Sequence, residues 1–225
     1  MSEVLNQISE NRVFKHLKEE SLQEISNRSV LRRFDAGEFI VNQGEVWPRL
    51  FMVIEGEIHA VMESQSGRVL IATTIHPGEI FWGLAFFIEN AMMPVSLQAN
   101  SASSIIIWTR EDLVPIIKEN GRVSWSICQV MINRMQLASE IVEELAFQPV
   151  MSRLSGLLLE VFGEAEGEFV SRELTLDDMA AHIGTTREMV CRHLYRLAEN
   201  GAIEISRTEL KINDRSFLED QASKV

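Results

Sequence analysis

Three charged residues, Arg187, Glu188 and Arg192, lie close together in a stretch with helical spacing. An Arg side chain can donate two hydrogen bonds to the O6 and N7 atoms of guanine, and a Glu carboxylate can accept one from the amino group of cytosine. The same pattern also suits a solvated helix face that is stabilised by a pair between Glu188 and Arg192, four residues apart. The elements around these residues decide between the two interpretations.

The segment that follows Thr175 predicts two short helices joined by a tight turn. Thr175 and Asp178 have the spacing of a helix-capping pair, so we expect a helix to begin after them. Gly184 can adopt the left-handed conformation that ends a helix, and Thr185 with Glu188 repeats the capping pattern directly afterwards. A second helix is therefore expected to carry the three charged residues in its first turns.

The second helix separates its apolar and basic residues. Val190, Leu194 and Leu197 have the spacing of a buried stripe, which leaves the charged side chains on the outer face. The residues that we expect to contact DNA are Thr185, Thr186, Arg187, Glu188, Arg192 and Arg196.

Beyond the second helix the sequence predicts a β-hairpin. Asn200 and Gly201 end the helix, and residues 202–206 and 210–212 are short strands around a polar turn. A helix-turn-helix followed by such a wing is typical of proteins that place one helix in a DNA groove. This context favours DNA binding over a solvated face.

Composition limits the kind of DNA binding. The chain has 225 residues, of which 46% are hydrophobic and 24% charged, as in an ordinary globular protein, and its net charge is -12. That charge opposes attraction to phosphates in general, so the binding is expected to be local, dimeric and sequence-selective. No apolar run approaches the roughly 18 residues of a membrane span, and we expect a cytoplasmic protein without membrane partners.

Other chemistry finds little support in the sequence. Cys128 and Cys191 lie far apart, so neither a disulfide framework nor a cysteine-based metal or iron–sulfur site is expected. The chain has no phosphate-binding glycine loop, no nucleophile elbow and no HExxH motif. We therefore expect no catalytic residues, no metal site and no enzymatic activity.

The first half of the chain has the pattern of a β-barrel. Between about Val30 and Trp108, short apolar strands alternate with glycines, which is typical of a barrel or jelly roll. A helical cover is expected over residues 8–25. The expected strands include 51–54 and 58–62, paired as a hairpin around Gly56, then 69–75 and the closing strand 105–108.

A long helix is predicted from Arg122 to Leu145, and its apolar spacing is close to that of a coiled coil. We expect it to form a homodimer seam, with a second apolar line at Val130, Leu137 and Ile141 facing its own barrel. A core helix within one protomer is the alternative. The seam residues are Ile127, Met131, Met135, Ala138, Val142 and Leu145.

These elements give an α+β fold class: an N-terminal double-stranded β-helix (jelly roll) barrel, a long dimerisation helix and a C-terminal winged helix-turn-helix. The expected domains are residues 1–120 for the sensor barrel, 121–148 for the dimerisation helix and hinge, and 149–225 for the DNA-binding domain. An event in the barrel would shift the paired helices, and a hinge near Pro149 would convert that shift into the spacing of two reading helices.

The chain resembles the CRP/FNR family of bacterial transcription regulators over nearly its whole length. The resemblance rests on residues 34–40, on the Leu-Ala-Phe of 145–147 and above all on residues 184–192, Gly-Thr-Thr-Arg-Glu-Met-Val-Cys-Arg. It implies a cyclic-nucleotide-type jelly roll and a half-site resembling TGTGA, read by Arg187, Glu188 and Arg192. RNA polymerase would be a further partner.

The effector site departs from the family pattern. Cyclic-nucleotide sites of the family carry a Gly-Glu-Leu turn and then an Arg-Ser pair, because a cyclic phosphate needs a guanidinium clamp. Here residues 83–85 read Gly-Leu-Ala and residues 93–95 read Met-Pro-Val, and no Arg occurs between Arg68 and Arg110. Cyclic AMP is therefore not expected to bind by the family's usual route, although a non-standard mode stays an alternative.

Apolar residues take the place of that site. They could form a pocket for haem or an apolar small molecule, with His16, His59 or His76 as candidate axial ligands. They could instead fill the pocket, which would leave a regulator that is always active or is controlled by its abundance or by a partner. The candidate pocket residues are Phe81, Trp82, Leu84, Phe86, Phe87, Met92 and Met93.

One alternative belongs to another functional class. The barrel and the winged helix could be docking surfaces of a protein-interaction module. Binding to several phosphates weakens steeply as salt rises, whereas an apolar protein interface does not, so salt dependence separates the two.

Overall fold

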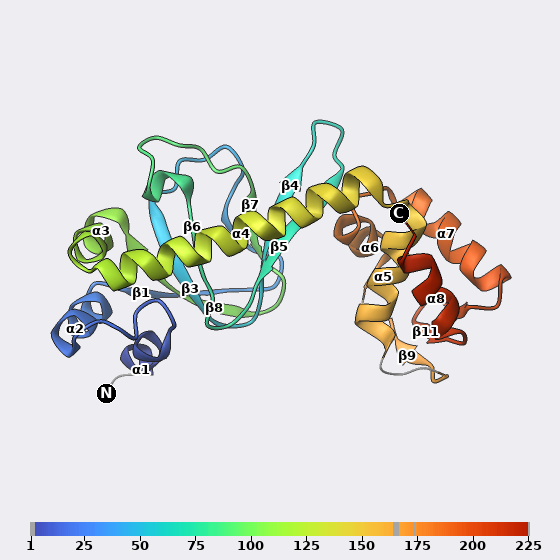
Figure 1. The fold of residues 1–225 in the computed structure, drawn as a ribbon, viewed down its shortest axis with the longest axis horizontal. Coiled ribbons are helices and arrows are strands. Elements are labelled where there is room, and N and C mark those ends of the chain that lie inside the picture. The colour runs from blue at the N-terminus through green and yellow to red at the C-terminus, as the bar shows by residue number, and fades with distance from the viewer. Residues whose placement is uncertain (1–2, 164–166, 173, 225) are drawn as a thin grey trace. The chain divides into compact units, whose positions relative to one another are not determined.

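The computed structural model describes residues 3–163, 167–172 and 174–224, which form two compact units (Figure 1). The first unit contains residues 1–62 and 72–137, and the second contains residues 63–71 and 138–225. The division falls inside the long helix α4 (Gly121–Phe147). Among the described residues no helix is both long and apolar enough to cross a membrane.

The first unit is built on two antiparallel sheets of four strands each. One has the strand order β1-β8-β3-β6 and the other the order β2-β7-β4-β5, which confirms the predicted jelly roll. The strands are β1 (Val30–Phe34), β2 (Phe39–Val41), β3 (Arg49–Glu55), β4 (Ile58–Glu63), β5 (Val69–Ile75), β6 (Ile80–Trp82), β7 (Ser96–Ala99) and β8 (Ser103–Thr109).

Strand β8 is buried on both of its faces, one inside the roll and the other under the helices that cover it. Its residues from Ser103 to Trp108 are all buried, and successive side chains point to opposite faces of the sheet. Ile105 and Ile107 belong to the interior cluster between the two sheets. Ile106 and Trp108 belong to a second cluster that includes helical residues. The predicted closing strand is thus confirmed, and it lies in the middle of its sheet, between β1 and β3.

The predicted hairpin around Gly56 is wrong in its pairing, although both of its strands exist. Strand β3 pairs with β6 and β8, whereas β4 pairs with β7 in the facing sheet. Gly56 has a φ of +75°, and a Cβ atom there would lie 2.6 Å from the carbonyl oxygen of Ala102. The glycine therefore carries the chain from one sheet to the other, which sequence spacing does not distinguish from a hairpin turn.

The predicted helical N-terminal cover consists of two helices, α1 (Glu3–Glu10) and α2 (Glu19–Asn27), joined by turns. The side chain of Asn11 interrupts the helix, because its Oδ1 accepts the N–H of Val13 at 2.9 Å and its Nδ2 donates to the carbonyl of Gly78 at 2.7 Å. The turns between the helices still bury Phe14, whose ring lies 5.4 Å from that of Trp108.

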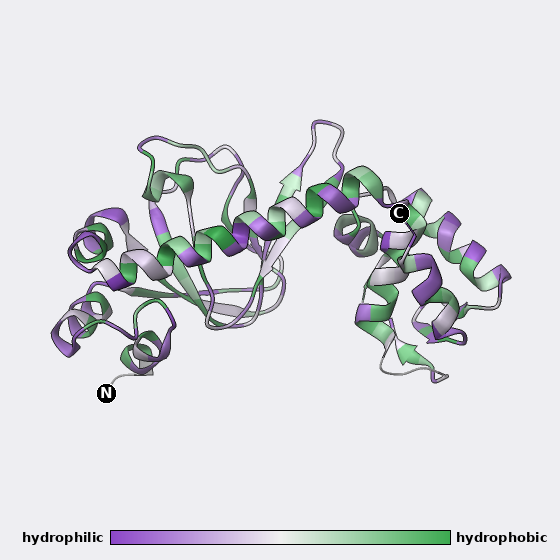
Figure 2. Cartoon of the chain, viewed as in Figure 1, coloured by the Kyte–Doolittle hydropathy of each residue, from purple (hydrophilic) through white to green (hydrophobic). Residues whose placement is uncertain are grey.

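Helix α4 follows α3 (Arg110–Glu119), and the first half of α4 packs against the cluster between the roll and the N-terminal helices. Val123, Ile127 and Val130 are buried in the same cluster as Trp108. Figure 2 shows hydrophobic and hydrophilic residues alternating along α4, and the exposed hydrophobic ones include Trp125, Ile132, Met135, Leu137 and Val142. The predicted helix is confirmed, but its buried line differs from the predicted one, which had placed Leu137 inside.

The second unit contains the predicted helix-turn-helix and wing, and its three-stranded sheet has the order β10-β11-β9. Helix α8 was not predicted, because only Phe217 and Leu218 break a polar stretch. It begins where the carboxylate of Asp214 accepts the N–H of Phe217 at 2.9 Å. The elements are α5 (Val150–Phe162), β9 (Val170–Ser171), α6 (Leu176–His182), α7 (Arg187–Glu199), β10 (Ile203–Ile205), β11 (Glu209–Ile212) and α8 (Arg215–Ala222).

Candidate nucleic-acid interface

Helix α6 begins with the predicted capping box. The hydroxyl of Thr175 accepts the N–H of Asp178 at 3.1 Å, and the carboxylate of Asp178 accepts the N–H of Thr175 at 2.8 Å. Two N–H groups that the helix leaves without backbone partners are thereby satisfied. Gly184, with a φ of +63°, then turns the chain as predicted.

Helix α7 begins one residue later than its predicted cap. Thr186 is the N-cap, and its hydroxyl accepts the N–H of Met189 at 3.4 Å. The N–H of Thr185 donates to the carbonyl of Ala180 at 3.0 Å, so Thr185 closes the turn after α6 and does not cap α7. Arg187 is consequently the first residue of the helix, where a reading helix meets base edges.

The outer face of α7 carries the charged residues and one that sequence reasoning missed. Val190, Leu194 and Leu197 are buried on the opposite face, as predicted. Tyr195 is 66% exposed and follows Arg192 by three residues, a spacing that could have identified it. Thr185 and Thr186 are half-buried. The exposed residues of the outer face are Arg187, Glu188, Arg192, Tyr195, Arg196 and Glu199.

The charged side chains of this face differ in their partners. The Nη1 atom of Arg187 lies 2.7 Å from the Oδ2 atom of Asp177 on α6. The pKa of Glu188 is lowered by hydrogen bonds from its own backbone N–H and from the hydroxyl of Thr186, and also by the charge of Arg187. Within the described ranges, neither Arg192 nor Arg196 forms an ion pair.

One buried residue of α7 is polar. His193 is 8% exposed, and its Nδ1 atom has no hydrogen-bond partner among the residues that the structure describes. Its pKa is lowered by burial first and then by the charges of Arg196 and Arg192, so the ring is held in its neutral form. A single histidine within an apolar stripe gives no sequence signal that would have found this.

The wing is a tight β10–β11 hairpin with a fixed tip. The hydroxyl of Ser206 accepts the N–H groups of Thr208 at 3.3 Å and Glu209 at 3.0 Å. Arg172 donates from its Nη2 atom to the carbonyl of Arg207 at 2.8 Å, while the side chain of Arg207 is exposed. The wing tip therefore exposes the side chains of Arg207, Thr208 and Glu209.

In the first unit, four of the candidate pocket residues are joined by ring contacts. The ring centroids of Phe81 and Trp82 are 5.7 Å apart, those of Trp82 and Phe87 5.8 Å, and those of Phe86 and Phe87 4.9 Å. Phe81 packs against the interior cluster to which Met93 belongs. Phe86 belongs to the cluster under the helices, with Trp82 and Phe87 packed against it. The remaining two, Leu84 and Met92, are exposed at 37% and 65%. The set thus spans two cores and the surface.

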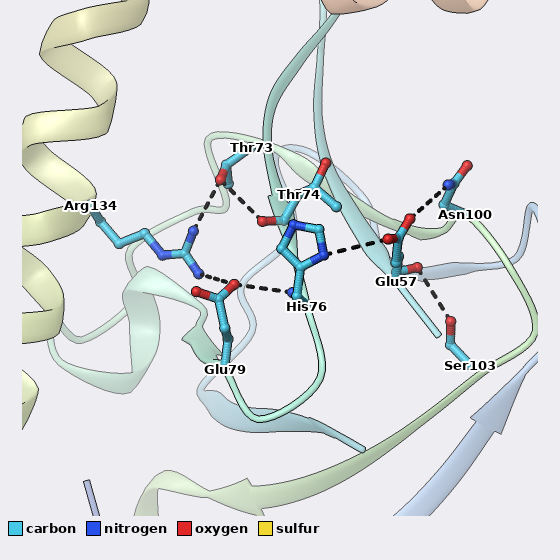
Figure 3. A network of polar contacts seen from close by, with 8 residues as sticks. All are labelled: Glu57, Thr73, Thr74, His76, Glu79, Asn100, Ser103 and Arg134. Carbon is cyan, nitrogen blue, oxygen red and sulfur yellow. Dashed lines mark hydrogen bonds and ion pairs between the residues drawn. The ribbon is translucent and has the colours of Figure 1, made fainter. Parts of the chain in front are cut away.

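A polar network joins α4 to the roll (Figure 3). The guanidinium of Arg134 donates to Thr73 at 3.0 Å and to Glu79 at 3.2 Å, and it lies 5.5 Å from the ring centroid of Phe81. Glu79 also accepts the backbone N–H of His76 at 3.0 Å. Arg134 is only 15% exposed, so this cation has carboxylate, hydroxyl and aromatic partners at once.

The segment that would clamp a cyclic phosphate presents no guanidinium. Met93, where the family pattern has Arg, is 2% exposed and belongs to the interior cluster. A thioether in that position cannot bind a phosphate oxygen, and Arg134 reaches the roll from α4 already paired with Glu79. These residues therefore do not fit a cyclic nucleotide held in the family's usual way.

The three candidate haem ligands lie on separate elements. His16 is exposed in the turns between α1 and α2, and His59 lies on β4. His76 follows β5, and its Nδ1 atom is 3.4 Å from the Oε1 atom of Glu57. Within the described part of the chain, no three His, Cys, Asp or Glu side chains are grouped as metal ligands would be.

Comparisons with known proteins agree with both units. Residues 31–120 match a family model described as a cyclic nucleotide-binding domain, and residues 152–221 match one described as a Crp-like helix-turn-helix domain. The cyclic AMP receptor protein of Thermus thermophilus is 24% identical over 191 residues, covering 85% of this chain and 87% of that protein.

Two solved structures have the same fold. A transcriptional regulator of the crp/fnr family from Eubacterium rectale has a TM-score of 0.80 at 20% identity, covering 94% of this chain and 97% of that one. The regulator CLP of Xanthomonas campestris, described as responsive to c-di-GMP, has a TM-score of 0.76 at 20% identity, covering 87% of this chain and 99% of that one.

Proposed function

The chain belongs to the CRP/FNR family of transcription regulators, and on that premise we propose that its homodimer binds a two-fold related DNA palindrome. The half-sites resemble TGTGA. The observation that carries the proposal is the orientation of α7: Arg187, Glu188 and Arg192 are exposed on its first two turns, opposite the buried face. That is the part of a reading helix that enters the major groove.

Each of these side chains has a suitable chemistry. Arg187 and Arg192 each donate two hydrogen bonds to a guanine, and Glu188 accepts one from a cytosine. The lowered pKa of Glu188 keeps its carboxylate ionised, which makes it an acceptor only. The half-buried Thr186 contacts the DNA backbone beside the helix N-terminus, and the exposed Tyr195, Arg196 and Arg207 contact phosphates.

The second copy of the chain is proposed to pack on an exposed apolar stripe of α4. Its residues alternate at steps of three and four, which is the spacing of a coiled-coil seam. The proposed stripe keeps Met135 and Val142 of the predicted seam and leaves out the other four predicted residues, Ile127, Met131, Ala138 and Leu145. Ile127 is buried in its own protomer, and Met131 packs against that core. The stripe consists of Trp125, Cys128, Ile132, Met135, Ser139 and Val142.

The proposed dimer binds its DNA without cyclic AMP. Support comes from the buried Met93 in place of the family's Arg and from Arg134, whose guanidinium is already paired with Glu79. The roll interior contains its own side chains, and the candidate apolar pocket residues divide between two cores. An interior that is filled by the roll's own side chains favours a regulator that is always active over a sensor of haem or of an apolar ligand.

Fluorescence anisotropy with a labelled palindrome of two TGTGA-like half-sites tests the proposal. Wild-type protein is expected to bind without any added nucleotide, and Arg187→Ala is expected to weaken binding by about 1–3 kcal/mol per half-site, or roughly 10-fold or more. Equal binding by Arg187→Ala would contradict the assignment of α7 as the reading helix.

Two additions to the same assay address the effector and the alternative function. Cyclic AMP is expected to leave the affinity unchanged. Added haem is expected to keep the broad Soret band of free haem, without the shift and sharpening that binding to the protein would cause. The logarithm of the affinity is expected to fall linearly with the logarithm of the salt concentration, by about 0.9 for each phosphate contacted. An affinity that does not respond to salt would favour the protein-docking alternative.

A further inference from the structure

We propose that Asp177 is a positioning residue that sets the base specificity of Arg187. The inference rests on the proposed function, because it concerns how one reading side chain of that interface is held. Asp177 is the second residue of α6 and Arg187 is the first residue of α7, so the contact crosses the turn between the two helices.

The contact involves one atom of each side chain. The Oδ2 atom of Asp177 lies 2.7 Å from the Nη1 atom of Arg187, a short charge-assisted hydrogen bond. The neighbouring Asp178 is committed to Thr175 in the capping box that begins α6. Two consecutive carboxylates thus have different partners, and only the one at 177 is directed at the reading helix.

Fold stability does not explain this ion pair. The side chains of Asp177 and Arg187 are 66% and 57% exposed, and ion pairs between such exposed side chains contribute little to the stability of a fold. A carboxylate at this surface also repels DNA phosphates, which weakens binding to every sequence. The carboxylate of Asp177 thus adds little to the stability of the fold and opposes DNA binding in general. An effect on the base selectivity of Arg187 explains its presence.

The remaining donors of Arg187 are sufficient to read a base. A guanidinium has five N–H groups in a rigid plane, and Asp177 accepts from one nitrogen, Nη1. The other donors can form the two parallel bonds to O6 and N7 of guanine. Fixing the side chain beforehand reduces the conformational entropy that is lost on binding, because a free Arg side chain samples many rotamers.

Restraint also removes alternatives when the guanine is replaced. A free Arg side chain can turn to a neighbouring base or to a phosphate. The affinity for a sequence that lacks the guanine is then only slightly lower than the affinity for the parent sequence. An Arg held by Asp177 leaves its donors unpaired against the wrong base, which is costly in a desolvated interface. Arg192 has no carboxylate partner among the described residues. Discrimination at the base pair that Arg192 reads should therefore not depend on Asp177, and this base pair is the reference for the comparison.

Anisotropy titrations of Asp177→Ala with three palindromes test the inference. One is the parent palindrome, the second has the Arg187 base pair changed in both half-sites, and the third has the Arg192 base pair changed. The variants Arg187→Ala and Arg192→Ala identify these base pairs as the positions where each loses discrimination. We expect Asp177→Ala to bind the palindrome with the changed Arg187 base pair at least fivefold more tightly, since it removes a repelling charge and frees the side chain. The other two palindromes are expected to bind with nearly unchanged affinity, because the lost restraint on Arg187 offsets the removed repulsion.

The decisive quantity is the ratio of Kd values between changed and parent palindromes. Asp177→Ala is expected to lower the ratio at the Arg187 base pair at least fivefold and to leave the ratio at the Arg192 base pair unchanged. Asp177→Asn keeps an acceptor without the charge, so it is expected to bind more tightly with an intermediate ratio. The matched control is Asp220→Asn, which removes one exposed, ion-paired carboxylate from α8 and should change neither ratio.

The outcomes separate this inference from the proposed function. If wild-type protein binds none of the palindromes, the proposed function is wrong. If it binds them and Asp177→Ala keeps its full ratio at the Arg187 base pair, only the inference is wrong. If both Asp177 variants lose all three palindromes together with a lower melting temperature, Asp177 belongs to the fold, and the inference is also overturned.

Discussion

The guanidinium of Arg134 on helix α4 lies 3.2 Å from the carboxylate of Glu79, which ends the turn between β5 and β6 (Figure 3). The same guanidinium donates to Thr73 and covers the ring of Phe81, so one side chain attaches the helix to the roll at three points. This cation therefore has carboxylate, hydroxyl and aromatic partners within its own chain.

Replacing Arg134 with Ala is expected to destabilise the first unit by about 1–3 kcal/mol, because the partly buried Glu79 loses a charged donor. Urea unfolding of both variants measures the difference. The control is Arg28→Ala, which breaks an exposed pair with Glu24 four residues away and should cost about 0.5 kcal/mol or less. Equal losses would show that the Arg134 contacts contribute no more than a surface pair.

Ile132→Glu is expected to weaken dimerisation at least 100-fold, because each copy of the seam loses a large apolar side chain worth about 1.5–3 kcal/mol on burial. Analytical ultracentrifugation measures the dissociation constant. Asn133→Glu adds the same charge one residue away from the stripe and should leave the dimer intact. A dimer that tolerates the change at Ile132 would place the seam elsewhere.

Cys128 is exposed and belongs to the proposed seam, so the Cys128 residues of two parallel helices come near each other in the dimer. Mild oxidation with copper phenanthroline is expected to give a covalent dimer on a non-reducing gel. Cys128→Ser should abolish it, whereas Cys191→Ser on α7 should not. A covalent dimer that persists without Cys128 would contradict the parallel seam.

Arg196→Ala is expected to weaken binding to all related sequences alike, since the contact proposed for Arg196 is with a phosphate. The slope of log affinity against log salt should fall by about 1.8, which is 0.9 for each of two subunits. Arg192→Ala should instead relax discrimination at one base pair. If the Arg196 variant changes base preference, that side chain reads a base.

Stability of the second unit is expected to fall as the pH drops below about 6.5, the ordinary pKa of histidine. Burial lowers the pKa of His193 and of His182 in the folded state, so below that pH the unfolded chain takes up protons that the folded chain does not. Thermal melts between pH 7.5 and 5.5 measure the loss. His193→Gln is expected to flatten the profile partly, and the exposed His16→Gln should leave it unchanged; a profile that His193→Gln does not alter would contradict this.

Sequence patterns predicted those parts of the fold that depend on local spacing. The capping box at Thr175 and Asp178, the turn at Gly184 and the buried line of α7 follow from residues within about two turns of one another. The outer face of α7 was predicted from the same periodicity, because the basic residues of the helix lie outside its buried apolar stripe.

Features decided by distant contacts could not be predicted. Gly56 looks like a hairpin turn, but the partners of β3 and β4 lie up to about sixty residues further along the chain, as in the pair of Arg49 and Thr109. Ile127 fits either side of an amphipathic helix, and only the core under α4 shows which side is buried. Arg134 lies about forty residues beyond the segment in which a clamp was sought, and its pairing with Glu79 leaves no mark in the local sequence.

The register that pairs Val30 with Ile107 also constrains how the chain folds. Strand β8 lies between β1 and β3 and pairs with both. The backbone edges of β1 and β3 that face β8 therefore stay unpaired until residue 109 has left the ribosome. A chain cut before residue 103 would keep β1 and β3 but expose their edges to other chains, which is a route to aggregation.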